Sequence, residues 1–192
     1  MMRLQTSRLE LVPMTLQMVE AVMSDRRDDS EAFAHARMPE RWPNRELIER
    51  AFPVSLDELR ADPERRLWGA RVMIASAGAS IAGADVSQSE RRVVGSIVFH
   101  DGKPGPDGIA EIAYGVEEGS QRRGYATEGV SACIAWALAQ EGVSAVQAAT
   151  FAWHSASLRV IENVGMKRVG VREHETMGEM LVYERRRAPL GA

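Results

Sequence analysis

The sequence predicts a mixed α/β domain, and three observations lead to this fold class. Apolar and β-branched runs of strand length recur along the 192 residues, and stretches with helical spacing of apolar residues separate several of them. Two neighbouring runs, at 92–101 and 108–116, are joined by the turn sequence "DGKPGPDG", which predicts an antiparallel hairpin. The chain is long enough to bury a core of its own, so we expect residues 1–192 to form a single domain.

The remaining elements follow from the same patterns. Apolar runs predict five further strands, at 8–13, 67–75, 144–152, 167–173 and 179–185. Periodic apolar residues predict helices at 14–28, 126–141 and 155–164. The helix at 126–141 is the best marked, because one apolar stripe runs from Val130 to Leu138 and Gly142 follows as a stop.

Two stretches carry weaker patterns. Residues 30–66 are rich in charge and proline, and they predict short helices between turns. Residues 76–91 are small and polar, and they predict a flexible loop.

Composition narrows the class of protein. A hydrophobic fraction of 45%, a charged fraction of 27% and a net charge of −3 are ordinary for a soluble globular domain and give no support to a nucleic-acid partner. The single cysteine, Cys133, excludes an intrachain disulfide, and no Cys/His spacing suggests a metal site. We find neither a signal-peptide pattern nor an apolar run of about 18 residues, so we expect a cytoplasmic protein without a membrane partner.

A basic, glycine-containing stretch, "QRRGYA" at 121–126, precedes the best-marked helix. The dinucleotide fingerprint and the nucleotide P-loop are both absent from it. Free backbone N–H groups and the positive end of a helix favour an anion there, and a side chain at Gly124 would hold a phosphate away from the backbone. By itself this stretch predicts an anion site, with a solvated loop as the alternative.

The surrounding residues narrow the kind of anion. The segment "IAEIAYGVEEGSQRRGYATEGV" (109–130) resembles the central motif of the GCN5-related N-acetyltransferases, Gln/Arg-x-x-Gly-x-Gly/Ala, at Gln121, Gly124 and Ala126. The segments "RLELVPMT" and "WHSASLRVIENVGM" (153–166) resemble the ribosomal-protein N-acetyltransferase branch of that family. The resemblance covers nearly the whole chain in the same order.

The resemblance implies a mixed, largely antiparallel sheet that splays into a V between the strands at 109–116 and 144–152. Acetyl-coenzyme A would enter the splay as co-substrate, with its pantetheine arm along the backbone of 114–116 and its pyrophosphate on the amides of 122–127. The cofactor-binding residues implied are Tyr114, Gly115, Val116, Gln121, Arg122, Arg123, Gly124, Tyr125, Ala126, Thr127 and Ser157.

The same resemblance implies residues for the two proton transfers. Glu111 stands where relatives keep a glutamate base, and the alternative is an ordinary ion-paired carboxylate. Ser157 stands near the expected thiol, and the alternative is helix capping by Ser155 or Ser157. Tyr183 is a rival acid that would serve equally well in core packing. His154 replaces the usual asparagine and could join a proton relay or simply cap the helix.

The predicted function is therefore transfer of an acetyl group to a primary amine by direct attack in a ternary complex. The acceptor could be a protein N-terminus or a small molecule, and residues 30–66, with Trp42, Phe52 and Trp68, could form its wall or merely pack on the sheet. A catalytically silent acyl-CoA-binding module is the main alternative, and a nucleotide- or phosphosugar-binding protein is a weaker one. The chain could be a monomer or a homodimer.

Overall fold

A computed structural model describes residues 2–40, 56–75 and 91–188. Within these ranges the chain builds one sheet in the order β1-β2-β3-β4-β5-β6-β8-β7, in which only β5 and β6 run parallel. This confirms the predicted fold class. The strands are β1 (Leu4–Gln5), β2 (Leu9–Pro13), β3 (Arg71–Ala75), β4 (Arg92–His100), β5 (Ile109–Val116), β6 (Ala145–Phe151), β7 (Lys167–His174) and β8 (Gly178–Arg186).

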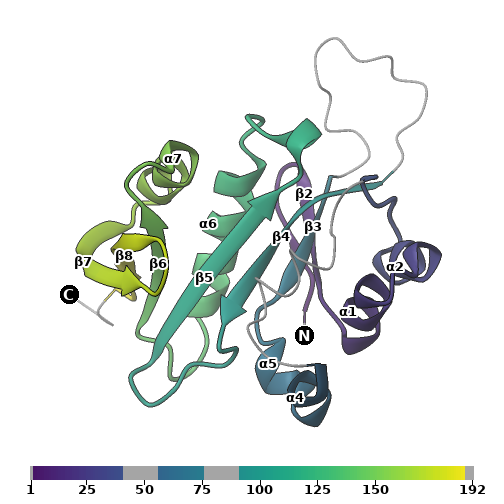
Figure 1. Ribbon diagram of the computed structural model, residues 1–192, viewed down its shortest axis with the longest axis horizontal. Coiled ribbons are helices and arrows are strands. Elements are labelled where there is room, and N and C mark those ends of the chain that lie inside the picture. The colour runs from purple at the N-terminus through teal and green to yellow at the C-terminus, as the bar shows by residue number, and fades with distance from the viewer. Residues whose placement is uncertain (1, 41–55, 76–90, 189–192) are drawn as a thin grey trace.

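Helices cover both faces of the sheet (Figure 1). One core cluster packs the inner sides of α6 and α7 on the sheet, and the other packs α1, α2 and α4 on the opposite face. Strand alternation divides the residues between them, since Met73 belongs to the first cluster and its neighbours Val72 and Ile74 to the second. The helices are α1 (Leu16–Met23), α2 (Arg27–Ala34), α4 (Leu56–Ala61), α5 (Pro63–Arg66), α6 (Tyr125–Leu138) and α7 (Ser155–Asn163), with a 3₁₀ turn, η1, at Glu118–Ser120.

The middle of the sheet splays apart. Residues 109–111 of β5 pair with 145–147 of β6, and the register ends there. Beyond that point the two strands diverge, with α7 following the far end of β6 (Figure 1). Residues 112–116 still pair with β4 on their other side. One edge of β5 is therefore left without a strand partner within the described chain.

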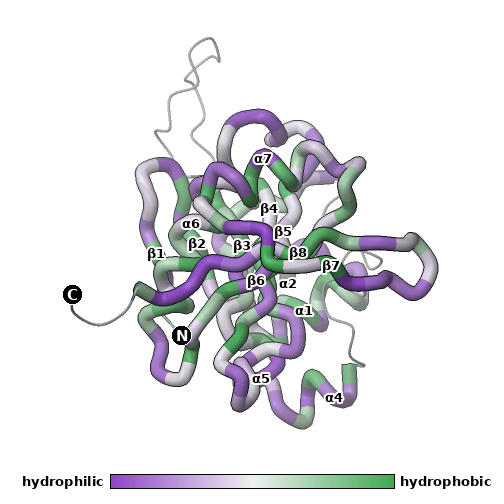
Figure 2. The backbone as a smooth tube through the Cα atoms, turned by 90° about the vertical axis from the view of Figure 1, so that its left-hand side faces the viewer, coloured by the Kyte–Doolittle hydropathy of each residue, from purple (hydrophilic) through white to green (hydrophobic). Residues whose placement is uncertain are grey.

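The β7–β8 hairpin forms the end of the sheet beyond β6. It extends from the body of the molecule and ends in a hydrophilic turn (Figure 2). β8 lies between β6 and β7, so the last strand of the sequence is not the last strand of the sheet.

Several predicted boundaries were wrong. The helix expected at 14–28 is two helices, because Asp25 adopts a positive φ of 53° and interrupts the pattern. The strand expected at 67–75 begins at Arg71, because Leu67 ends α5 and Gly69 turns the chain with a φ of 73°. The helix expected at 126–141 spans 125–138, and β1 was not predicted.

The structure describes the predicted acceptor wall and the predicted flexible loop only in part. Trp42, Phe52 and most of the loop 76–91 lie outside the described residues. Trp68 packs against Phe99 and Trp136, with ring centroids 5.0 and 4.9 Å away, so its role is core packing.

The core contains one charged side chain with few partners. Arg71 is fully buried, donates from Nη1 to the Gly69 carbonyl at 2.7 Å and lies 4.0 Å above the ring of Trp136. Its Nε and Nη2 atoms find no hydrogen-bond partner among the described residues. Burial raises the pKa of the nearby Cys133 thiol to about 11, although the charge of Arg71 opposes this rise. A thiol with so high a pKa is protonated at neutral pH, so Cys133 is not suited to be a nucleophile.

Candidate active site

The loop before α6 has the backbone form of an anion site. Arg122 and Gly124 both adopt left-handed conformations, with φ of 60° and 80°, and Gly124 is the N-cap of α6. Residues 121–124 are exposed. The first N–H groups of a helix have no acceptor within the helix, and the dipole makes this end positive. The loop therefore offers several outward donors at one place.

The loop adjoins the open edge of β5. The Gln121 side chain donates from Nε2 to the Val116 carbonyl at 3.1 Å, so two of the predicted cofactor contacts touch each other. Residues 114–116, predicted for the pantetheine arm, lie within the stretch of β5 that has lost its β6 partner. A ligand with both an extended amide-containing arm and phosphates would meet complementary groups along this path.

Glu111 lies on β5, on the strand side that Ala113 also faces. Arg172 of β7 holds its carboxylate through two hydrogen bonds, from Nη1 at 2.8 Å and from Nη2 at 2.6 Å. Burial alone would raise the pKa of the Glu111 carboxyl, but the hydrogen bonds and charge of Arg172, with a smaller effect of His100, hold the pKa below its ordinary value of 4.5. Glu111 is thus an ion-paired carboxylate that is ionised at neutral pH.

This ion pair lies in the wall of a polar cavity of about 960 Å³. The walls come from α4, α5, the β4–β5 turn and the starts of β5 and β6, with Arg172 from β7. Ionisable side chains of both signs line it, including Glu58, Arg65, His100, Lys103 and Glu111. Part of the stretch 30–66, predicted as the acceptor wall, therefore contributes to the cavity that contains the predicted base.

Ser157 and Tyr114 meet across the splay. The Tyr114 hydroxyl lies 3.0 Å from the Ser157 Oγ and also donates to the Ser157 carbonyl at 3.2 Å. Burial raises the pKa of the Tyr114 hydroxyl, although the hydrogen bond with Ser157 opposes this. Ser157 lies in the first turn of α7, whose N-cap is His154. The site therefore holds two linked hydroxyls where the sequence suggested one.

The other two predicted catalytic residues have different surroundings. His154 caps no backbone group with its side chain, and its Nδ1 lies 3.4 Å from the Thr150 Oγ1. Tyr183 lies on β8 opposite Ala148 and packs against the first core cluster. Neither contact joins these residues to Glu111.

Two parts of this arrangement were missed by sequence reasoning. Arg172 is 61 positions from Glu111, and no local pattern relates the two. The Tyr114 hydroxyl was overlooked because only the backbone of Tyr114 was considered. Alternation along "AEIAY" predicts that Tyr114 faces away from Glu111, but no local pattern relates its hydroxyl to Ser157, 43 positions further along the chain.

Across the described ranges, no cluster of three His, Cys, Asp or Glu side chains is arranged to hold a metal ion. No helix in the same ranges has the length and apolarity needed to cross a membrane.

A family model described as the acetyltransferase (GNAT) domain matches residues 8–167. No curated protein matches the chain by sequence.

Three solved structures illustrate the fold. An acetyltransferase of the GNAT family from Bacillus anthracis aligns with a TM-score of 0.58 and 19% identity, covering 97% of this chain and 99% of that one. The ribosomal-protein-S5-alanine acetyltransferase from Vibrio fischeri aligns with a TM-score of 0.61 and 11% identity, covering 100% of both chains. The ribosomal L7/L12 α-N-protein acetyltransferase RimL, in complex with coenzyme A, aligns with a TM-score of 0.59 and 15% identity. This alignment covers 96% of this chain and 98% of RimL.

Proposed function

Because the chain belongs to the GNAT acetyltransferase family, we propose that it transfers an acetyl group from acetyl-coenzyme A to a primary amine in a ternary complex. The observation that carries this proposal is the open edge of β5 leading into the amide-rich loop at 121–127. Coenzyme A, the proposed ligand, would use both the open edge and the loop, because it carries an amide-containing arm and a pyrophosphate. RimL, a protein of the same fold, was solved with coenzyme A.

The residues present fit that co-substrate. The backbone of Tyr114, Gly115 and Val116 would pair with the pantetheine amides, and the N–H groups of 122–127 would receive the pyrophosphate. An added Cβ at Gly124 would meet the Arg8 Nη2 at 3.1 Å and would be strained by the positive φ. Bound in this way, acetyl-coenzyme A supplies an activated thioester carbonyl.

In the proposed reaction, the amine nitrogen attacks the thioester carbonyl. A C–N bond forms, the C–S bond breaks, one proton leaves the nitrogen and one is taken up by the departing thiolate. Since an alkyl amine is mostly protonated at neutral pH, a carboxylate near the acceptor is useful.

We assign Glu111 to the amine side. It is ionised and lies in the cavity wall, where an incoming ammonium group would compete with Arg172 for the carboxylate. Its lowered pKa makes it a weak base while Arg172 is bound, so displacement of Arg172 would strengthen it.

We assign Ser157 to the thiol side, with the Tyr114 hydroxyl as its hydrogen-bond partner. Tyr183 remains the rival acid, and His154 remains a candidate for a relay through Thr150. The acceptor is a protein N-terminus or a small amine, and the ribosomal-protein acetyltransferases of the same fold favour testing N-terminal peptides first.

The test is a screen of amines and N-terminal peptides with acetyl-coenzyme A, reading free thiol and acetylated product. Amine-dependent thiol release supports the enzyme. Tight coenzyme A binding without release for any acceptor would favour the acyl-CoA-binding module, which shares the loop and the open edge. Binding of ATP without binding of coenzyme A would favour the nucleotide-binding alternative.

A further inference from the structure

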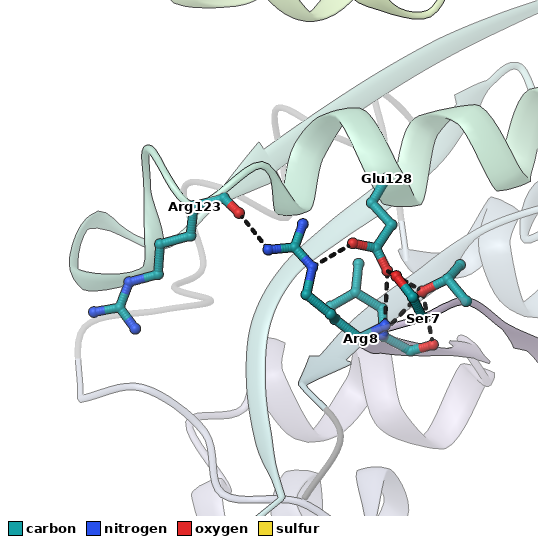
Figure 3. A network of polar contacts seen from close by, with 6 residues as sticks. Ser7, Arg8, Arg123 and Glu128 are labelled. Atoms are coloured by element: carbon teal, nitrogen blue, oxygen red, sulfur yellow. Dashed lines mark hydrogen bonds and ion pairs between the residues drawn. The ribbon is translucent and has the colours of Figure 1, made fainter. Parts of the chain in front are cut away.

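We propose that Arg8, immediately before β2, is a positioning residue for the coenzyme A pyrophosphate, because it ties the 121–127 loop to the N-terminal segment. This inference rests on the proposed function. Arg8 is 115 positions from Arg123, yet it donates from Nη1 to the Arg123 carbonyl at 2.8 Å (Figure 3).

The anchor on the helix side is Glu128, in the first turn of α6. Its carboxylate accepts four hydrogen bonds from the short segment 6–8, including the Arg8 backbone N–H at 2.8 Å and the Arg8 Nε at 2.7 Å (Figure 3). The other two come from Thr6 Oγ1 at 2.5 Å and Ser7 Oγ at 3.0 Å. Four donors on one carboxylate fix α6 rigidly to the β1–β2 turn.

The turn itself is well held. The Thr6 backbone N–H closes it by donating to the Leu9 carbonyl at 2.9 Å, and the Thr6 Oγ1 accepts from the Leu9 N–H at 2.9 Å. Leu9 is fully buried in the first core cluster. The loop is therefore tied, through Arg8, to a point that is anchored in the core.

While its Nε binds Glu128, the outer part of the Arg8 guanidinium group lies against the loop. The group also lies 5.1 Å from the ring centroid of Tyr125, the first residue of α6. Its Nη2 faces Gly124, since a Cβ built on that glycine would lie 3.1 Å from it. Arg8 thus contacts three consecutive residues at the point where the chain turns from loop to helix.

Two physical effects follow. The loop contains left-handed Arg122, which costs roughly 1–2 kcal/mol for a residue with a side chain, so an external tie is needed to hold it. Glu128 also places a negative charge one turn from the proposed pyrophosphate, and the Arg8 guanidinium neutralises that charge. Without Arg8 the loop would lose its tie and the phosphates would face an uncompensated carboxylate.

The test compares Arg8→Met with the wild type, using acetyl-coenzyme A and S-acetylpantetheine, a thioester that lacks the pyrophosphate. We expect Arg8→Met to raise the KM for acetyl-coenzyme A about tenfold, to leave the KM for the amine unchanged, and to have little effect with S-acetylpantetheine. Arg8→Lys keeps the charge but cannot bind the Glu128 carboxylate and the Arg123 carbonyl together, so its rise in KM should be smaller than that of Arg8→Met.

Controls separate positioning from general destabilisation. Arg3→Met removes an ion pair of the same length, 2.7 Å between Arg3 and Glu10, from the same N-terminal segment but away from the loop. It should leave acetyl-coenzyme A binding unchanged. If Arg8→Met does not fold, Arg8→Lys provides the second test, because it keeps a positive charge beside the partly buried carboxylate of Glu128.

The outcomes distinguish the two proposals. If the wild type fails to bind coenzyme A in calorimetry, the proposed function is wrong. If the wild type binds and Arg8→Met binds equally well, only the role of Arg8 is wrong. Equal losses with both thioesters would likewise overturn it, because they would show a general structural effect.

Discussion

Replacing Arg172 with methionine is expected to raise the pKa of the Glu111 carboxyl, because the two hydrogen bonds that stabilise its charged form are lost and burial then dominates. The stability effect is small. The Arg172 side chain is 49% exposed and that of Glu111 25%, so solvent screens the pair and we expect the free energy of unfolding to fall by about 1 kcal/mol.

The pH dependence of this loss has a definite sign. The folded pKa of Glu111 lies below its ordinary value of 4.5, so the pair contributes fully above that value and its contribution disappears as the pH falls through the folded pKa. Urea unfolding should therefore separate the variant from the wild type at neutral pH and bring them together at the acidic end. Arg186→Met, which removes the 2.6 Å pair with Glu184 on β8, is the matched control.

The same variant tests the proposed proton acceptor. With a weakly basic amine such as a hydrazide, whose own ionisation does not mask the carboxylate, the acidic limb of kcat should move to higher pH in Arg172→Met. In Glu111→Gln that limb should disappear and the rate at neutral pH should fall about a hundredfold. An unmoved limb, or an undiminished rate in Glu111→Gln, would show that Glu111 is an ordinary ion-paired carboxylate.

Three further outcomes are expected. Arg71→Met should leave the free energy of unfolding in urea unchanged or raise it by about 1 kcal/mol, because a buried guanidinium with two unsatisfied nitrogens is removed; a loss above about 2 kcal/mol would contradict this. Gly124→Ala should weaken coenzyme A binding in calorimetry about tenfold, since alanine is strained at a φ of 80°, and unchanged affinity would refute the role of the loop. Ser157→Ala should lower kcat about tenfold or more while Tyr183→Phe changes it less than about twofold, and the reverse order would make Tyr183 the acid.

Much of the fold could be predicted from the sequence, because the patterns that indicate strands and helices are local. The apolar run "VMIA" is typical of a strand buried on both faces, and the apolar stripe of 130–138 predicts which side of its helix is buried. The main boundary errors also have local causes. Asp25 takes a left-handed conformation that an ordinary helical pattern does not announce, so one helix was predicted where the chain forms two.

The long-range side-chain contacts of the site could not be predicted from the sequence, because they depend on how the elements are arranged in space. Arg172 reaches Glu111 only because β7 becomes the edge strand, with β8 between it and β6, and places Arg172 in the wall of the cavity. Arg8 meets Arg123 only because the N-terminal turn lies beside the start of α6. No spacing of 61 or 115 residues carries such information.

The arrangement of β5 suggests why one strand can serve both proton transfers. Successive side chains point to opposite faces, so Glu111 faces the polar cavity while Tyr114, three positions later, faces α7 and touches Ser157. On the proposed function, the amine proton and the thiolate proton are then handled on opposite faces of the sheet. Both faces border the open edge between β5 and β6, and this is where the proposed thioester would lie. On the proposed function, the splay would have two consequences: it would expose backbone groups to the pantetheine arm, and it would let two opposed sets of side chains act on one carbonyl.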